Sequence, residues 1–194
     1  VADLFDFGWK HPQKTQPRVR RIFAVSLPDD LCASYDAYKS RLQENHGLSG
    51  VNEKLLFHGT PRHCSLGEGD DWDTLCRMPN CNLCGILRSS FLVSRAGSAP
   101  DRKFMRFGRG IYTSSVSSKA DDYTNDLDDS PNKVVIVAKV ALGKASIYYR
   151  TTASLTRPPS GYNSVQGEVG QSLNYDEQVL YHDDAIRPAY VVVY

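Results

Sequence analysis

The chain has 194 residues, of which 41% are hydrophobic, and this length and composition suit one compact domain with a full core. Lys and Arg total 23 against 22 Asp and Glu, so no net basic field attracts nucleic acid or an anionic membrane. The longest apolar run, residues 134–138, falls far short of the roughly 20 residues that a membrane span needs.

Residues 1–17 mix Phe, Trp, Lys, His and Pro without a period, which predicts an extended, partly disordered arm ahead of a domain at 18–194. Phe5, Phe7 and Trp9 alternate and could pack on a partner surface. The N-terminus has neither the charged region nor the apolar region of a signal peptide. The missing initiator Met indicates a fragment whose true start, and any targeting signal before it, is unseen.

Alternating apolar residues predict a first strand over 18–27, and Pro28 with the two following acids opens a helix. That helix places apolar residues on one face, and its Cys32 is most simply a small core residue. The face consists of Leu31, Tyr35, Tyr38 and Leu42. Residues 54–57 predict a short buried strand that ends at His58. A lone His at a strand end is usually a surface or hydrogen-bonded residue.

An insert at 61–84 carries four of the five cysteines: Cys64, Cys76, Cys81 and Cys84. Such clustering is more typical of a metal site than of a spread disulfide framework. A Cys-x2-Cys pair lets two thiolates reach one ion, and two further cysteines complete a closed structural Zn²⁺ site, which we predict. Buried free thiols, two disulfides, and His63 in place of one cysteine remain as alternatives.

The stretch 107–123 predicts a turn, a strand and a helix that carry two tyrosines to one pocket. Gly108 and Gly110 permit backbone angles and a close ligand approach that a side chain would forbid. The serines between 114 and 118 offer N-cap oxygens to the helix. Tyr112 and Tyr123 would then form a slot for a flat ring, although both could equally be core or rim residues.

The remaining elements follow from local patterns. Residues 82–90 predict a short helix with Ile86 and Leu87 inward, and 93–106 a loop over the cleft. The nearly continuous apolar run at 133–142 predicts a strand in the centre of a sheet. Residues 148–159 and 160–172 read as loops, and 177–181 with 189–194 as a hairpin-like pair of strands.

Several ordered blocks resemble one known family. They are Leu-Leu-Phe-His-Gly-Thr at 55–60, Phe-Gly-Arg-Gly-Ile-Tyr at 107–112, Ser-Ser-Lys at 117–119, Pro-Pro-Ser-Gly-Tyr-Asn-Ser-Val-Gln-Gly at 158–167 and Asp-Glu-Gln-Val-Leu-Tyr at 176–181. Their order resembles the catalytic domain of the poly(ADP-ribose) polymerase (PARP) family, in the diphtheria-toxin class of ADP-ribosyltransferases, with tankyrases closest in pattern. The resemblance covers about residues 18 to 194. It implies an α+β fold with a split antiparallel β-sheet and few short helices, to which this chain adds the Cys-rich insert.

The resemblance also implies a site for NAD. Tyr123 would stack on the nicotinamide, with Tyr112 at its edge and the Gly59 backbone N–H and C=O holding the carboxamide. His58 would bind a ribose hydroxyl of the adenosine half, beside Thr60. Arg95, Arg102, Lys103 and Arg106 in the covering loop could meet the pyrophosphate or form an ordinary solvated face.

The catalytic set implied by the resemblance is His58, Tyr112 and Glu177. The Glu177 carboxylate would stabilise the oxocarbenium charge that develops when the bond between nicotinamide and ribose breaks. One position departs from the family, because Ala120 stands where PARPs commonly have a serine that meets the carboxamide. Ser118 is a candidate substitute, but helical geometry turns it to a different face.

We therefore expect an NAD-dependent ADP-ribosyltransferase that moves single units, with some NAD hydrolysis. The acceptor is expected to be a macromolecule, most simply a protein, with nucleic acid still open. A monomer inside the cell, cytoplasmic or nuclear and without a membrane partner, fits these features. The competing interpretation is a catalytically silent module that keeps the fold and binds NAD or a partner.

Overall fold

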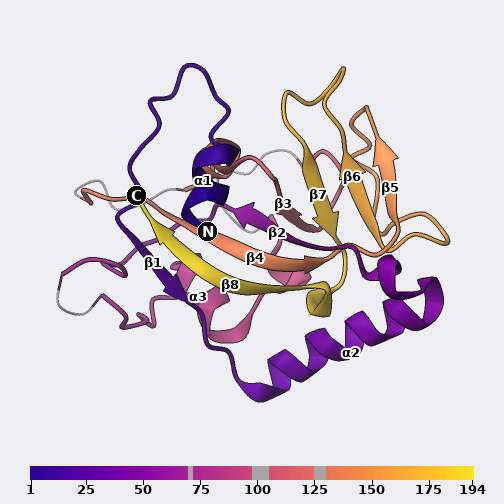
Figure 1. The fold of residues 1–194 in the computed structure, drawn as a ribbon, viewed down its shortest axis with the longest axis horizontal. Coiled ribbons are helices and arrows are strands. Elements are labelled where there is room, and N and C mark those ends of the chain that lie inside the picture. Colours follow the sequence, from indigo (N-terminus) through magenta and orange to yellow (C-terminus); the bar gives the residue numbers. More distant parts are fainter. Residues whose placement is uncertain (70–71, 98–104, 125–129) are drawn as a thin grey trace.

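A computed structural model describes residues 1–69, 72–97, 105–124 and 130–194. Within them, two four-stranded sheets and a few helices make up the fold (Figure 1). The helices are α1 (Ala2–Gly8), α2 (Asp29–His46), α3 (Asn82–Ser89) and α4 (Ser117–Asp121), with 3-10 turns at Leu48–Val51, Val93–Arg95 and Asp183–Ala185. The strands are β1 (Arg21–Ala24), β2 (Glu53–His58), β3 (Ile111–Thr113), β4 (Val134–Ala141), β5 (Ala145–Tyr148), β6 (Ser164–Gly167), β7 (Glu177–Leu180) and β8 (Ile186–Val193). No helix in these described ranges is long and apolar enough to cross a bilayer.

The first sheet, here called the β4 sheet, has the order β1-β8-β4-β2, and all its pairings are antiparallel. Every side chain of β4 except that of Lys139 is buried. A strand that is covered on both faces needs apolar residues at successive positions and not at alternate ones. The prediction that this apolar run is a central strand is confirmed.

The second sheet, here called the β7 sheet, has the order β3-β7-β6-β5. Its strands pair antiparallel except β5 and β6, which are parallel. The two sheets meet where β2 passes β3, because the backbones of Phe57 and Ser114 exchange two hydrogen bonds of 2.8 and 3.0 Å. The predicted α+β fold with a split, largely antiparallel sheet is therefore confirmed.

Helices cover both faces of the β4 sheet. In Figure 1, α2 runs along the lower edge and α3 lies below β8, whereas α1 lies above β4. The lower cluster includes Tyr35, Tyr38 and Leu42, three of the four residues of the expected helical stripe, together with Cys84 and Leu87 of α3. The fourth, Leu31, is only partly buried. The upper cluster joins α1 to apolar residues of β2, β4 and β8.

The expected extended arm at residues 1–17 is wrong for its first half, which forms helix α1. Phe5 is fully buried, with its ring centroid 4.8 Å from that of Tyr194 and 6.1 Å from that of Phe57. Phe7, by contrast, is 76% exposed. A helix of two turns has little intrinsic stability, so burial of one ring against distant residues decides its formation, and local pattern could not show it.

The expected hairpin of the last two strands is also wrong. Strand β7 pairs with β3 and β6, whereas β8 pairs with β1 and β4 in the other sheet. Strands β5 and β6 lie partly in stretches that were expected to be loops. Each has only four residues, and such short strands are specified by long-range pairing more than by their own pattern.

Asp121, at the end of α4, ties three distant segments together. Its carboxylate accepts hydrogen bonds from Lys14 Nζ at 2.5 Å, Lys133 Nζ at 2.9 Å and the Tyr194 hydroxyl at 2.9 Å. Burial disfavours the charged form of Asp121, but the bonds from Lys14, Lys133 and Tyr194 outweigh it and hold the pKa below its ordinary value. The segment after α1 is thus fixed to the rest of the fold by a buried charge.

We expect Asp121→Asn to lower the free energy of unfolding at pH 7 by about 2–3 kcal/mol, because two ammonium groups lose a charged acceptor. A lowered pKa means that this stabilisation is present above the ordinary aspartate pKa and is lost as the pH falls through the lowered one. Denaturant unfolding should therefore show the difference between wild type and variant shrinking below about pH 4.

The matched control is Asp122→Asn. Asp122 also accepts a bond from Lys14, but its side chain is 45% exposed, so the expected loss is less than about 1 kcal/mol. Equal losses for the two variants would contradict the special role assigned to Asp121.

Candidate functional site

Helix α4 is the element around which the candidate site is built. It begins at Ser117 after an N-cap at Val116, and no serine side chain caps it, so the expected serine N-cap is wrong. Instead the Ser114 hydroxyl accepts a bond from the Val116 N–H at 3.1 Å, and Ser117 donates to the Phe5 carbonyl at 2.7 Å. The serines therefore anchor the helix to β3 and to α1.

The end of β2 packs directly on the end of α4. A Cβ atom on Gly59 would lie 1.8 Å from the Ala120 carbonyl oxygen and 3.0 Å from Tyr123 Cβ. No residue with a side chain fits at position 59 unless α4 moves. The glycine of the His-Gly pair is thus required by packing between two elements, in addition to any ligand that its backbone meets.

His58 and Tyr112 are fixed by backbone groups. The Tyr112 carbonyl accepts a hydrogen bond from His58 Nδ1 at 2.8 Å, which places the proton on Nδ1 and makes Nε2 of the neutral ring an acceptor. The Tyr112 hydroxyl donates to the Gly108 carbonyl and accepts from the Phe107 N–H, both at 2.8 Å. Gly108 has a positive φ of 67°, so this turn needs glycine.

A pocket opens between the end of β2 and helix α3. Of the predicted site residues, it is lined by His58, Gly59, Thr60 and Tyr112. The opposite wall comes from α3 and the segment after it, with Asn82, Gly85, Ile86, Ser89 and Arg95. Glu177, Ser118 and Tyr123 do not line it.

Glu177, at the start of β7, is only 5% exposed. Its Oε1 is 3.0 Å from Lys119 Nζ, which also donates to the carbonyls of Tyr175 and Asp176 at 2.9 and 3.0 Å. Burial lowers the pKa of Lys119, while the charge of Glu177 opposes that shift. The second carboxylate oxygen, Oε2, is buried and has no hydrogen-bond partner among the described residues.

Two predicted contacts, Ser118 and Tyr123, are not part of the pocket lining. Ser118 is fully buried, and its hydroxyl bonds the backbone N–H groups of Lys10 and His11 at 2.9 and 3.1 Å and His11 Nδ1 at 2.7 Å. It therefore faces the N-terminal segment. Tyr123 is 44% exposed and borders Gly59.

The described basic residues of the covering loop also lie in different places. Arg95 lines the pocket, whereas Arg106 donates to the Thr151 hydroxyl at 3.3 Å. Arg102 and Lys103 lie outside the described residues.

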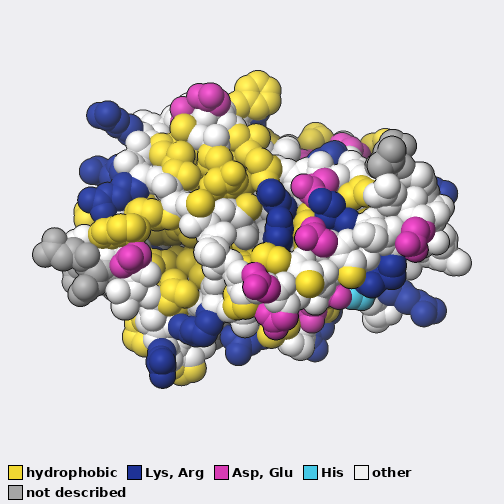
Figure 2. Space-filling view, turned by 60° about the horizontal axis from the view of Figure 1, so that its bottom comes forward, with side chains coloured by type: hydrophobic (Ala, Val, Ile, Leu, Met, Phe, Trp, Pro, Cys, Tyr) yellow, Lys and Arg dark blue, Asp and Glu magenta, His cyan; other side chains and the backbone are white. Residues whose placement is uncertain are grey.

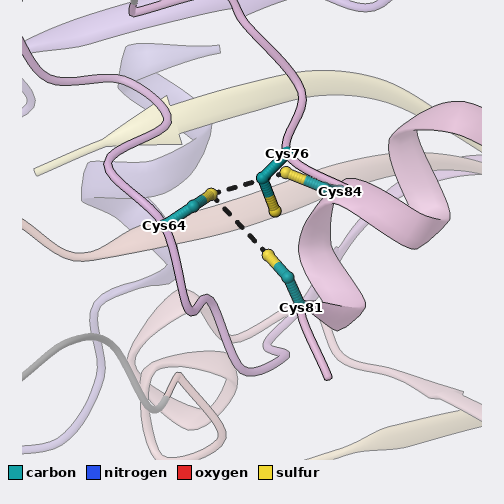
Figure 3. A group of neighbouring side chains, drawn as sticks. All are labelled: Cys64, Cys76, Cys81 and Cys84. Atoms are coloured by element: carbon teal, nitrogen blue, oxygen red, sulfur yellow. Dashed lines mark hydrogen bonds between the residues drawn. The ribbon is translucent and has the colours of Figure 1, made fainter. Parts of the chain in front are cut away.

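The four clustered cysteines converge at the N-terminal end of α3. Their sulfur atoms point toward one another (Figure 3) and all lie within 4.8 Å of one another. Cys64 Sγ is 3.7 Å from Cys81 Sγ and 3.5 Å from Cys84 Sγ. Sulfurs about 2.3 Å from a tetrahedral ion lie about 3.8 Å apart, so the spacing fits a four-thiolate metal site.

Hydrogen bonding supports a thiolate in this cluster. The Cys84 thiol donates to Cys81 and lowers the Cys81 pKa, and the His63 backbone N–H also donates to Cys81 Sγ at 3.5 Å. No disulfide links the cysteines, which are all free. Cys32 stays apart on α2, with its Sγ 4.0 Å from the Leu27 carbonyl. The four clustered cysteines could therefore hold a metal ion.

The α3 wall of the pocket was missed by the sequence analysis. Asn82, Gly85 and Ser89 are small or neutral and carry no chemical signature. Their one available signal was the spacing of four residues from Asn82 to Ile86 and of three from Ile86 to Ser89, which places them on one face. That spacing does not distinguish a pocket wall from a solvated face.

Comparison with known proteins agrees with this arrangement. Residues 79–185 match the model of the poly(ADP-ribose) polymerase catalytic domain. Protein mono-ADP-ribosyltransferase PARP4 of Mus musculus is 30% identical over 151 residues, and the Homo sapiens protein of the same name is 29% identical over 146 residues; each match covers 73% of this chain. Poly [ADP-ribose] polymerase 1 of Xenopus laevis is 31% identical over 116 residues, or 60% of this chain.

These matches cover only 7%, 8% and 10% of the respective relatives. The particular closeness to tankyrases stays a prediction. The family itself is shown, because the matched model spans more than half of the chain, including α3, β3, α4 and β7. The chain belongs to the poly(ADP-ribose) polymerase catalytic domain family.

Proposed function

We propose that this domain is an active ADP-ribosyltransferase that cleaves NAD and transfers ADP-ribose, mostly as single units, to a macromolecule. The observation that carries the proposal is the state of Glu177. One of its carboxylate oxygens is paired with Lys119, and the other is buried without a partner among the described residues. Leaving a buried carboxylate oxygen unsatisfied is costly, so a donor from a bound substrate is the natural complement.

NAD would enter along the pocket and continue toward Glu177. The Gly59 backbone offers a donor and an acceptor for the carboxamide, with Tyr123 beside it for stacking, worth on the order of 1 kcal/mol beyond area burial. His58 Nε2, an acceptor in the neutral ring, suits a ribose hydroxyl of the adenosine half. Thr60 and Arg95 line the same pocket, and Arg95 supplies positive charge for the pyrophosphate.

The chemical step needs charge stabilisation more than a strong nucleophile. The bond between nicotinamide and ribose breaks, and nicotinamide leaves with the bonding electron pair. Positive charge then develops at the anomeric carbon, where the Glu177 carboxylate stabilises it through the neighbouring ribose hydroxyl. An acceptor oxygen or nitrogen, or water, bonds that carbon and loses its proton. Lys119 orients the carboxylate.

One family contact is missing from this donor site. Ala120 has no hydroxyl for the carboxamide, and the Ser118 hydroxyl is already bonded to Lys10 and His11. Ser118 is therefore left out of the proposed NAD contacts. The absence of one hydrogen bond is expected to weaken donor binding by about tenfold without abolishing it.

A protein is the favoured acceptor. The formal net charge is +1, and Figure 2 shows Lys and Arg lying among Asp and Glu on the viewed face rather than forming one continuous basic area. Nucleic-acid binding normally needs such an area. We propose that the domain acts as a monomer, in the cytoplasm or the nucleus.

We further propose that the four clustered cysteines bind one structural Zn²⁺. A closed set of four thiolates suits this ion, since structural zinc sites leave no position open for substrate. The ion would hold the insert, and it takes no part in bond cleavage.

Glu177→Gln is expected to lower the rate of nicotinamide release by a factor of about 100 or more, because the charge is lost while the shape is kept. Affinity for a non-hydrolysable NAD analogue and the melting temperature should change little. Glu44→Gln, the same change at an exposed site on α2, is the matched control. Near-normal release by the Glu177 variant would reject the role. Analogue binding without any release by wild type would instead favour the silent module.

Incubation with labelled NAD should give a single discrete shift of the acceptor on electrophoresis, together with free ADP-ribose. Elongation needs a second ADP-ribose positioned with its hydroxyl at the anomeric carbon, and such near-attack geometry is worth several kcal/mol. Two of the relatives are named mono-ADP-ribosyltransferases. A ladder of long chains that disappears in Glu177→Gln would overturn the expectation of single units.

Metal analysis of the purified protein should find about one zinc ion per chain, and a strong chelator should lower the melting temperature, because metal binding energy is folding energy. Cys32→Ser should keep the zinc, since Cys32 lies outside the cluster. If the purified protein contains no zinc and the chelator leaves its melting temperature unchanged, the cysteines are core thiols.

A further inference from the structure

Three of the four cluster cysteines lie on, or within three residues of, the two segments that line the pocket. Cys64 follows the end of β2 by six residues, after the pocket-lining run from His58 to Pro61. Cys81 is the N-cap of α3 and Cys84 lies in its first turn, next to the pocket-lining residues Asn82 and Gly85. The Cys64 sulfur, beyond the end of one wall, therefore meets the sulfurs of Cys81 and Cys84 at the start of the other.

Few other polar contacts join the two walls at this end. Within the described residues, the Leu83 N–H donates to the Pro61 carbonyl at 3.1 Å, and the His63 N–H donates to Cys81 Sγ at 3.5 Å. The second of these bonds is made to a sulfur of the cluster itself, so only the first is independent of the cysteines. A metal bound to Cys64, Cys81 and Cys84 would supply the strong connection between the end of β2 and α3.

We propose that the metal in this cluster sets the separation of the two pocket walls, so that affinity for NAD depends on metal occupancy. The proposal rests on the proposed function, because it assigns the pocket to the dinucleotide. Without metal, the loss of this connection lets α3 move away from the run His58 to Pro61. The apparent affinity is then the intrinsic affinity multiplied by the fraction of molecules whose pocket walls keep the separation that binds NAD.

Only the part of the pocket next to α3 is expected to depend on the metal. Helix α3 is a rigid element of eight residues, so movement at its cluster end also displaces Ile86 and Ser89 farther along the pocket. The Gly59 end is fixed independently, by its contact with the Ala120 carbonyl on α4. Binding of the whole dinucleotide should therefore depend on the metal, while binding of benzamide, a nicotinamide mimic that needs only the Gly59 end, should not.

Cys76 is the position at which to test this. It belongs to the cluster, but it comes from the insert loop and does not line the pocket. Cys76→Ser removes one ligand, whereas Cys76→His replaces a thiolate by an imidazole that also binds zinc tetrahedrally. Cys32→Ser, on α2 and outside the cluster, controls for loss of a thiol as such.

The measurements are zinc content, circular dichroism, and the dissociation constants of a non-hydrolysable NAD analogue and of benzamide. We expect Cys76→Ser to lose zinc, keep its secondary structure, and bind the analogue about tenfold more weakly, with benzamide affinity within about twofold of wild type. Cys76→His and Cys32→Ser should retain zinc and bind both probes like wild type.

Three results would overturn the proposal. Metal-free Cys76→Ser that binds the analogue as tightly as wild type would separate the metal from the donor pocket and leave the proposed function intact. Loss of analogue and benzamide affinity together would show general disruption instead of a displaced α3. Absence of analogue binding by zinc-loaded wild type would count against the proposed function itself, and the inference would fall with it.

Discussion

The contact between Gly59 and the Ala120 carbonyl is the constraint on which the site depends. It holds the end of β2 against the end of α4, at the place where the two sheets meet through Phe57 and Ser114. Lys119, the residue before Ala120, then reaches Glu177 on β7. One short helix thus fixes the separation between the His-Gly segment and the carboxylate. Because interiors are close-packed, even one added methyl group at position 59 would displace both the His-Gly segment and the carboxylate.

Residues with a distinctive chemistry could be placed from the sequence. The cysteine spacing predicted a cluster that the structure assembles, and the ordered motifs predicted the family and the split sheet. His58, Gly59, Thr60 and Tyr112 do lie around one pocket, although their roles remain predictions. Ordered motifs can be recognised without coordinates because they require particular residue types at fixed positions.

Elements that form only through contacts with distant residues could not be predicted from the sequence. Helix α1 forms because Phe5 fills a space between Phe57 and Tyr194, and strands β5 and β6 form because they pair with each other. Neither event has a local cause. The destination of Ser118 depended on the same helix, since the segment that follows α1 occupies its hydroxyl. Because helix α1 was not predicted, Ser118 was wrongly offered as an NAD contact.

The strand order of the β4 sheet has a consequence for how the chain is made. Strand β4 is apolar along nearly its whole length, and its second neighbour, β8, emerges from the ribosome only after residues 142–185 have been added. At roughly 5–20 residues per second, β4 spends several seconds with an open apolar edge. Strand β1 waits still longer, because β8 is its only partner in the described sheet. The nascent chain therefore exposes an apolar strand edge during synthesis, and the stability of the finished fold does not shorten that exposure.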